Sequence, residues 1–372
     1  MLVTLVLSIY GFFCILLTLA WTFWPASKGT PKEQKSKKIS LIIPVRNEAK
    51  VIQNLLKDLE AQSLSSKDFE VLIVNDNSTD ETEVIVANYI KQSKIDLKLV
   101  NLEAVQSVSS PKKRAIGEAI ELADGEIIVT TDGDCRVPNQ WLESIQIYFA
   151  ENDCVFLSAP VSFEALKPKG LFKTIWYKFQ EIEFASLIVS GATSLKMGQP
   201  NMCSGANLAY LKSAFYEVDG YKGNEHIASG DDEFLLHKMK EHFPGAIHYL
   251  KDEKATVHTP PLANVSSFYM QRKRWASKWQ HYRTLSPKAL AFFIFSCNAL
   301  FIYALFSINI QWMLIKLIPE FLFLASALVF FKKSKLILLI PILQILYPFY
   351  VVFFGLLSLK KNKYVWKERE LS

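Results

Sequence analysis

The chain has 372 residues, a length that allows two or three domains, and 50% of them are hydrophobic. Its formal net charge is +6, and the basic residues gather beside apolar segments, which favours anionic lipid headgroups as a partner. The interleaved aromatic and basic pattern of nucleic-acid modules is missing, so we expect no nucleic-acid partner. The 5 cysteines are odd in number and scattered, and they indicate neither a disulfide framework nor a zinc site.

An apolar segment opens the chain. Residues 1–24 carry no charged side chain and are long enough to cross a bilayer. They lack the basic start and the small-residue cleavage site of a signal peptide, so we predict an uncleaved transmembrane anchor. A basic linker over 25–38 follows directly, with Lys28, Lys32, Lys35, Lys37 and Lys38. The positive-inside rule then predicts an integral protein of the cell (inner) membrane whose middle part faces the cytoplasm.

Three further apolar stretches, 289–310, 312–331 and 336–357, predict a C-terminal transmembrane region over 289–359 and a basic tail over 360–372. Lys316 and Glu320 interrupt the second stretch at i, i+4 spacing and can pair within one helix. Pro341 and Pro348 predict that the third stretch is kinked or re-entrant. We therefore expect two to three transmembrane helices in this region.

The middle of the chain alternates strands and helices. Apolar runs over 39–45, 69–74, 97–101 and 127–131 predict strands, and helical patterns follow the first three of them. This alternation predicts an α/β domain with a mostly parallel sheet covered by helices, similar to a Rossmann domain. The first strand-to-helix turn, Pro44-Val-Arg-Asn-Glu48, has no glycine, which excludes the dinucleotide fingerprint, and no phosphate-binding P-loop is present. Residues 171–187 predict a helix against the membrane or the sheet.

Two acids follow the fourth predicted strand. Asp132 and Asp134 stand at its carboxyl end, where open α/β sheets bind ligands. Carboxylates at this spacing suit a magnesium ion that also holds substrate phosphates. Gly133 leaves room for a ligand to approach the backbone closely. An isolated D-x-D is also compatible with a solvated acidic turn, so the rest of the chain has to decide.

Four features follow one another in order along the chain. They are the strand-end Asp76, the Asp132/Asp134 pair, Gly230-Asp-Asp-Glu233 at a helix start, and Gln271-Arg-Lys-Arg-Trp275 before the apolar stretches. This order resembles the family 2 inverting glycosyltransferases of GT-A fold, in their membrane form with a D, D-x-D, D, Q-x-x-R-W signature. Ceramide glucosyltransferases and the processive chitin, hyaluronan and cellulose synthases have this form. The resemblance covers about residues 38–282, and we expect a catalytic domain over 39–262 and an interfacial helix over 263–288.

The resemblance implies a donor pocket at the strand ends. Its expected residues are Pro44, Arg46, Glu48, Asp76, Lys113, Asp132 and Arg274. Asp76 would contact the nucleotide base, Asp132 the ribose and diphosphate, and Asp134 would bind Mg²⁺ or Mn²⁺. One of three consecutive cations, Lys112, Lys113 or Arg114, would approach the donor, and the sequence does not decide which.

The resemblance also implies an acceptor side and a general base. Asp232 takes the role of the base that receives the acceptor proton. Asp231 stands where the family has glutamate, one methylene longer, so which of the two acids points inward stays open. Acids at a helix start also favour the helix dipole without any catalytic role. The expected acceptor-binding residues are Gly205, Asn207, Gln271 and Trp275.

The function implied by the resemblance is sugar transfer with inversion from a nucleotide sugar, UDP-linked, to a lipid or lipid-linked acceptor at the membrane. A glycan acceptor is the alternative, as in a processive polysaccharide synthase, although few apolar segments are available for a translocation path. A non-catalytic membrane protein that binds nucleotide sugars is an alternative of another class. It would be favoured if an acid of the signature were missing, and none is.

Overall fold

The computed structural model describes residues 1–25, 36–104, 109–166, 168–227, 229–278, 285–358, 364–366 and 369–371. The chain forms two compact units. The helical unit contains Met1–Pro25, Ala165–Gln199 and Pro261–Tyr364, and the sheet unit contains Ala26–Glu164, Pro200–Pro260 and Val365–Ser372.

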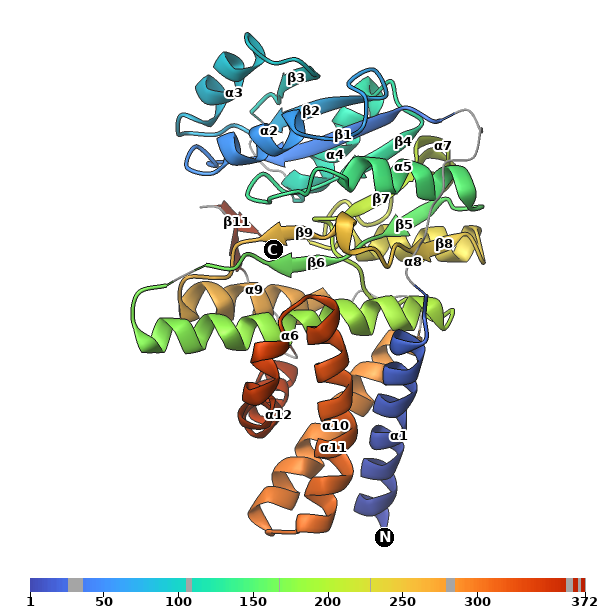
Figure 1. Ribbon diagram of the computed structural model, residues 1–372, viewed down its shortest axis with the longest axis vertical. Helices are drawn as coiled ribbons and strands as arrows, with labels where there is room; N and C mark the ends of the chain where they lie inside the picture. The colour runs from blue at the N-terminus through green and yellow to red at the C-terminus, as the bar shows by residue number, and fades with distance from the viewer. Residues whose placement is uncertain are drawn as a thin grey trace. The chain divides into compact units, whose positions relative to one another are not determined.

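The sheet unit is built on a 7-stranded sheet with the order β3-β2-β1-β4-β7-β5-β8 (Figure 1). The strands are β1 (Ile39–Val45), β2 (Phe69–Asn75), β3 (Asp96–Asn101), β4 (Ile127–Thr130), β5 (Phe156–Ser158), β7 (Leu208–Leu211) and β8 (Ile247–Tyr249). All neighbours are parallel except for β7, which runs antiparallel to β4 and β5. The predicted α/β fold with a mostly parallel sheet is confirmed.

The register brings three strand ends to one edge of the sheet. Val45 of β1 pairs with Asn75 of β2, and Ile42 of β1 pairs with Thr130 of β4. The central strands are buried along almost their whole length, which is why they read as continuous apolar runs in the sequence. The segments that follow these strands therefore emerge side by side.

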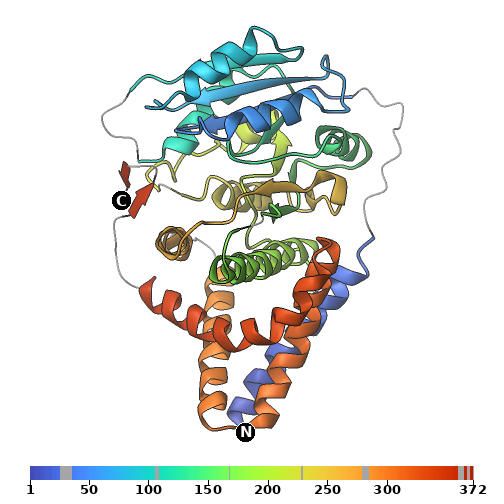
Figure 2. The same ribbon diagram turned by 60° about the vertical axis from the view of Figure 1, so that its left-hand side comes forward.

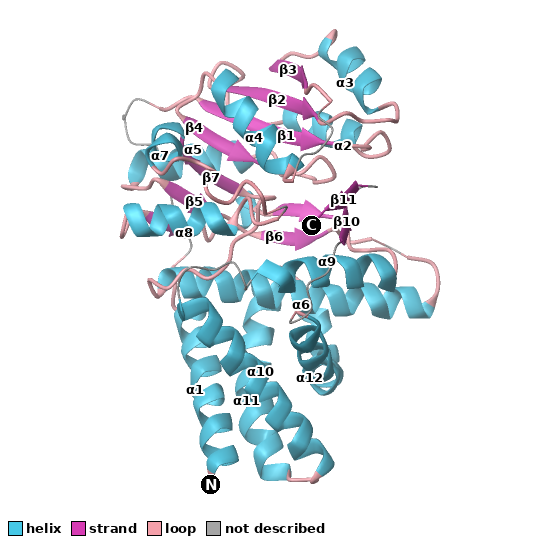
Figure 3. Cartoon of the chain, turned by 180° about the vertical axis from the view of Figure 1, so that it is seen from behind, coloured by secondary structure: helices cyan, strands magenta, loops and turns pink. Residues whose placement is uncertain are grey.

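Helices cover the faces of this sheet (Figure 3). They are α2 (Ile52–Glu60), α3 (Thr82–Ile90), α4 (Pro111–Leu122), α5 (Trp141–Glu151), α7 (Lys212–Glu217) and α8 (Glu233–His242). Helix α2 buries Ile52, Leu55, Leu56 and Leu59, the i, i+3, i+4, i+7 face that the sequence predicts. Pro111 stands at the start of α4, where its missing N–H breaks no helical hydrogen bond.

Two small sheets complete the strands: β6 (Val161–Phe163) pairs with β9 (Val257–Thr259), and β10 (Tyr364–Trp366) pairs with β11 (Arg369–Leu371). A 3₁₀ turn, Glu253–Ala255, precedes β9. Arg136 joins His258 in an isolated antiparallel bridge. The Arg136 guanidinium also donates to both carboxylate oxygens of Asp58, at 2.6 and 2.7 Å. These contacts fasten the segment that follows the D-x-D acids to α2 and β9.

The helical unit contains long apolar helices. Among the described residues, 4 helices are long and apolar enough to cross a membrane: α1 (Leu2–Thr22), α10 (Leu285–Phe306), α11 (Ile310–Phe330), and the segment Ser334–Leu357, which ends in α12 (Ile340–Leu357). Helices α1 and α11 approach closely, since a Cβ on Gly11 would lie 2.8 Å from the carbonyl oxygen of Ile315. The same Cβ would lie 3.2 Å from Pro319 Cγ, so the missing side chain of Gly11 makes room for both the carbonyl and the proline ring of α11.

Two more helices, α6 (Leu171–Lys196) and α9 (Val265–Ser277), belong to the helical unit. They lie beside each other and run across the direction of α1 and α11 (Figures 1 and 2). Trp176 and Gln180 of α6 donate to the carbonyl of Leu262, just before α9. Because α6 falls between β6 and β7 in the chain, the residues predicted as one catalytic domain, 39–262, contribute to both units.

Candidate active site

The segments that follow β1 and β2 support each other at the sheet edge. The backbone N–H of Asp76 donates to the carbonyl of Val45 at 2.9 Å. The Arg46 guanidinium donates to the carbonyls of Asp76 and Asn77, at 2.7 and 2.5 Å. Asn47 and Asn77 both have positive φ, a backbone conformation that asparagine tolerates well. Arg46 is buried at this edge, where it fixes the backbone that presents Asp76.

Glu48 and Pro44 belong to the same edge. The N–H of Glu48 donates to the hydroxyl of Thr82, at 2.8 Å, and Pro44 is partly buried at the end of β1. A Cβ on Gly133 would lie 2.8 Å from Val45 Cγ1 and 3.2 Å from Glu48 Cγ. The space at Gly133, which the sequence suggested for a ligand, is thus filled by the protein itself. The glycine lets the D-x-D turn pack against the end of β1.

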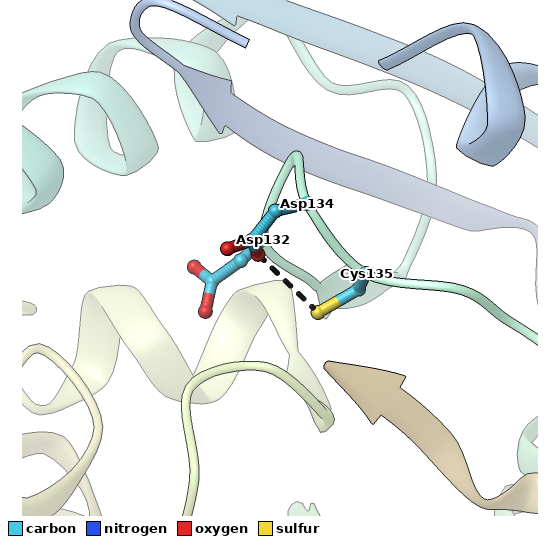
Figure 4. Close-up of side chains that lie close together, drawn as sticks. All are labelled: Asp132, Asp134 and Cys135. Atoms are coloured by element: carbon cyan, nitrogen blue, oxygen red, sulfur yellow. Dashed lines mark hydrogen bonds between the residues drawn. The ribbon is translucent and has the colours of Figure 1, made fainter. Parts of the chain in front are cut away.

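The D-x-D acids lie together immediately after β4 (Figure 4). Within the described part of the chain, a group that can hold a metal ion consists of Asp132, Asp134 and Cys135, whose ligand atoms all lie within 4.8 Å of one another. Burial raises the pKa of the Cys135 thiol well above its ordinary value, and both aspartates add to this effect. A protonated thiol is a poor ligand, so the two carboxylates are the groups that suit a hard divalent cation.

Lys112, in the first turn of α4, joins these acids to a second acid pair. Its Nζ lies 2.7 Å from Asp132 Oδ1 and 3.1 Å from Asp231 Oδ2. Burial works against the charge of this amine, but the aspartates outweigh burial and raise the pKa of Lys112. A permanent positive charge therefore lies between the D-x-D turn and the start of α8.

Lys113, the cation in the predicted donor set, binds backbone carbonyls instead of the acids. Its Nζ donates to the carbonyls of Asn224 and Ile227, at 2.7 and 2.9 Å, and lies 5.1 Å from the centre of the Phe234 ring. Arg114 pairs with Glu118 on the surface of α4. The structure thus brings Lys112 to the acids instead of Lys113. The side chain of Lys113 is almost fully buried, and it fastens the loop before α8.

Asp232 caps α8 and reaches the loop before β7. Its Oδ1 accepts from the N–H of Glu233 at 2.8 Å, and its Oδ2 accepts from the N–H of Gly205 at 3.0 Å. A Cβ on Gly205 would lie 2.9 Å from Asp231 Oδ2 and 3.0 Å from Lys112 Nζ. Only glycine fits here without moving the acids or the amine. Gly205 therefore lies inside the acid cluster, and its role in binding an acceptor stays a prediction.

Asn207 differs from Gly205, although the two are only two residues apart. It is fully buried, its Nδ2 donates to the carbonyls of Pro160 and Ala255 at 2.8 Å, and its Oδ1 accepts from the Trp141 indole at 2.9 Å. Both Nδ2 hydrogens are used, and the side chain is fully buried in the core, out of reach of an acceptor molecule. We therefore assign Asn207 to the fold and drop it from the acceptor side.

The Q-x-x-R-W residues Gln271, Arg274 and Trp275 lie on α9, in the helical unit, whereas the other expected site residues lie in the sheet unit. The sequence gave no role to Arg272, the second residue of this motif. It is 3% exposed, and its guanidinium lies 4.2 Å from the Trp275 ring. The contact of Arg274 with the donor stays a prediction.

A mostly parallel sheet with a D-x-D turn at one strand end and a second acid pair beside it is the architecture of a GT-A glycosyltransferase. Residues 40–219 match the family described as Glycosyl transferase family 2. These residues thus have the sequence of a family 2 glycosyltransferase domain.

Two curated relatives share part of their length with this chain. The poly-beta-1,6-N-acetyl-D-glucosamine synthase of Staphylococcus epidermidis is 28% identical over 66% of this chain and 55% of its own length. The beta-monoglucosyldiacylglycerol synthase of Nostoc sp. is 33% identical over 28% of this chain and 22% of its own length. The matched residues thus span about half, or less, of these relatives.

A solved structure is similar over nearly the whole chain. The mannosyltransferase PcManGT from Pyrobaculum calidifontis, in complex with GDP-Man and Mn²⁺, aligns with 96% of this chain and 96% of its own, with a TM-score of 0.56 and 16% identity. This similarity supports the fold of the chain.

Proposed function

We propose that the chain transfers a sugar, with inversion, from a UDP-linked nucleotide sugar to a lipid or lipid-linked acceptor at the cytoplasmic face of the cell membrane. The observation that carries the proposal is the cluster of Asp132, Lys112, Asp231, Asp232 and Gly205. Residues far apart in the sequence meet there at the carboxyl edge of the sheet. The following steps assign each of them a task.

The donor side is proposed to use Asp76 for the base, with Pro44, Arg46 and Glu48 shaping the pocket edge. Asp134, with Asp132 beside it, would hold Mg²⁺ or Mn²⁺, which suits two carboxylates next to a protonated thiol. When bound, the metal would neutralise charge on the departing diphosphate. Lys112 takes the place that the sequence gave to Lys113, because its charge already lies against Asp132.

The acceptor side is proposed to use Asp232 as general base. One oxygen of Asp231 is occupied by the Lys112 ammonium, whereas each oxygen of Asp232 accepts one backbone N–H among the residues that the structure describes and has a second lone pair. The Gly205 contact also places Asp232 against the loop expected on the acceptor side. Gln271 and Trp275 are proposed to bind the acceptor, and Arg274 to bind the diphosphate.

The acceptor is proposed to be a lipid, because the unit that carries α9 also contains 4 candidate membrane spans. The lipid glucosyltransferase among the relatives agrees with this class of acceptor. A growing glycan is the second candidate, favoured by the longer match to a polysaccharide synthase. The mass of the product formed from labelled nucleotide sugar and membrane lipids distinguishes one added sugar from a polymer.

The test of the mechanism is Asp232→Asn beside Asp231→Asn, with donor affinity and single-turnover transfer measured for each. We expect Asp232→Asn to slow transfer by about 10²–10⁴-fold with donor affinity nearly unchanged, since a positioned base contributes this much. If Asp231→Asn is the inactive variant instead, the base is the neighbouring acid. If neither change slows transfer, the proposed mechanism fails.

The proposed orientation has its own test. Of the 5 cysteines, Cys203 in the sheet unit is partly exposed and the other four are buried. A thiol reagent that cannot cross membranes should label Cys203 after permeabilisation and leave it unlabelled in intact cells, and Cys203→Ser is the control. Labelling in intact cells would place the sheet unit outside.

A further inference from the structure

A buried ion pair joins three helices of the helical unit. Arg272 of α9 donates through Nε to Glu183 Oε1 of α6 at 2.9 Å, and its Nη2 pairs with Glu183 Oε2. Tyr350 of α12 donates its hydroxyl to the same Oε1 at 3.0 Å. Arg272 and Glu183 are 3% and 5% exposed. One carboxylate therefore ties α6, α9 and α12 together.

The Arg272 guanidinium is enclosed by its own helix as well. The Phe268 and Trp275 rings lie 4.5 and 4.2 Å from it, and its Nη1 donates to Gln271 Oε1. A planar guanidinium that pairs with both oxygens of a carboxylate accepts essentially one orientation. The rotation of α9 about its own axis is thereby fixed against α6 and α12.

This ion pair is not required for packing alone. Buried ion pairs can often be replaced by apolar side chains of similar volume without loss of stability. We therefore ask which geometry the Arg272–Glu183 pair specifies. Helix geometry suggests the answer. With 3.6 residues per turn, Arg274 lies about 200° around the α9 axis from Arg272. Holding Arg272 between α6 and α12 turns Arg274 to the opposite side of α9.

We propose that Arg272, Glu183 and Tyr350 form a positioning unit that sets the rotation of α9 and thereby the place of Arg274. The inference rests on the proposed function, in which Arg274 contacts the donor diphosphate. The three residues of the unit act through Arg274 and touch no substrate themselves. Slipping α9 by one residue would move Arg274 by about 100°, away from its target.

A double-mutant cycle on the purified full chain tests the proposal. Arg272→Lys keeps the charge and loses the planar guanidinium that pairs with both oxygens of Glu183. We expect it to weaken donor affinity about tenfold, within the range of coupling between interacting residues. In an Arg274→Ala background the same change should alter donor affinity less than about twofold, because the residue being positioned is gone. Lys273→Gln, on the same helix, is the matched control and should leave donor affinity unchanged.

Tyr350→Phe keeps the ion pair and removes one hydrogen bond, so it covers the case in which Arg272→Lys does not fold. It should weaken donor affinity by a smaller factor, and this effect too should vanish in the Arg274→Ala background. If Arg274→Ala itself leaves donor affinity unchanged, the donor role of Arg274 in the proposed function fails, and the positioning unit with it. If Arg274→Ala weakens donor binding but the other changes have no effect or simply add to it, the positioning unit alone is overturned.

Discussion

The acids at the sheet edge and the acids among the apolar helices differ in how many hydrogen-bond partners the protein gives them. The Asp132 side chain is 40% exposed, and one of its oxygens pairs with the Lys112 ammonium. Glu320, in the middle of α11, accepts from Tyr10 at 2.6 Å, from Lys316 at 2.9 and 3.0 Å, and from Gln344 at 3.0 Å. One acid is open to a ligand, and the other is saturated by the protein.

The surroundings explain this difference. Helix α11 is long and apolar enough to cross a bilayer, and a polar group in a spanning helix has to find its partner within the protein because no water is available there. Lys316 and Glu320 pair as the i, i+4 spacing predicts, and Tyr10 and Gln344 bring α1 and α12 to the same carboxylate. At the sheet edge, water or a substrate can complete the shell of Asp132. Saturated acids thus hold helices together, and open acids are the ones to test for ligands.

The largest effect is expected from Asp134→Ala. It should abolish measurable transfer and weaken donor binding in Mg²⁺ or Mn²⁺, because the diphosphate loses its counter-charge. The variant should still fold, since Asp134 is not part of the buried core, and thermal unfolding checks this. Glu121→Ala, an exposed acid on α4, is the control and should keep full activity. Full activity of the wild-type chain after treatment with a chelator would rule out the metal.

A second change breaks the saturated cluster. Glu320→Ala leaves the buried Lys316 amine without its carboxylate, and removing one partner of a buried pair costs about 3–5 kcal/mol. Thermal unfolding in detergent should show this loss, while donor affinity of the folded fraction stays unchanged. The matched control is the double variant Lys316→Met with Glu320→Met, which removes both charges and should recover part of the loss, although Tyr10 and Gln344 still lack this acceptor. A single variant as stable as the wild type would contradict the helix-holding role.

Much of the fold was predictable because the central strands are buried on both faces. Such strands need continuous apolar runs, and the runs over 39–45, 69–74 and 127–131 correspond to β1, β2 and β4 within one residue. The run over 97–101 corresponds to β3, which lies at the edge of the sheet and is less buried. That α6 belongs to the helical unit was not predictable. Its contacts with α9 and α12 depend on Glu183, whose partners Arg272 and Tyr350 lie about 90 and 170 residues away in the sequence, a distance that local patterns cannot report.

The acids of the candidate site could be proposed from the sequence, and their neighbours could not. Asp132 and Asp232 were proposed from the order of the signature acids, and the structure adds that Lys112 lies against Asp132 and against Asp231, the neighbour of Asp232. The choice between Lys112 and Lys113 depends on the phase of α4 and on two carbonyls, those of Asn224 and Ile227, that only the folded chain brings near. Asn207 looks like a site residue in sequence because nothing local shows that its amide completes a core network.

The smallest effects are expected from the adjacent cations Lys112 and Lys113. Lys112 pairs with the partly exposed Asp132, whereas Lys113 is buried and held by two backbone carbonyls. Lys112→Met should weaken donor affinity by about 10–100-fold, the range for losing a hydrogen bond to a charged group, with little change in unfolding. Lys113→Met should do the reverse. It leaves the carbonyls of Asn224 and Ile227 without their donor, which costs about 1–3 kcal/mol of stability, and donor affinity of the folded protein should hold. Calorimetric titration with the nucleotide sugar, beside thermal unfolding, measures both quantities on each variant. If Lys113→Met is the variant that loses donor affinity, then the Lys113 amine leaves its two carbonyls when the donor binds. In that case the hydrogen bonds of a cation in the free protein do not tell whether the cation is structural or binds the ligand.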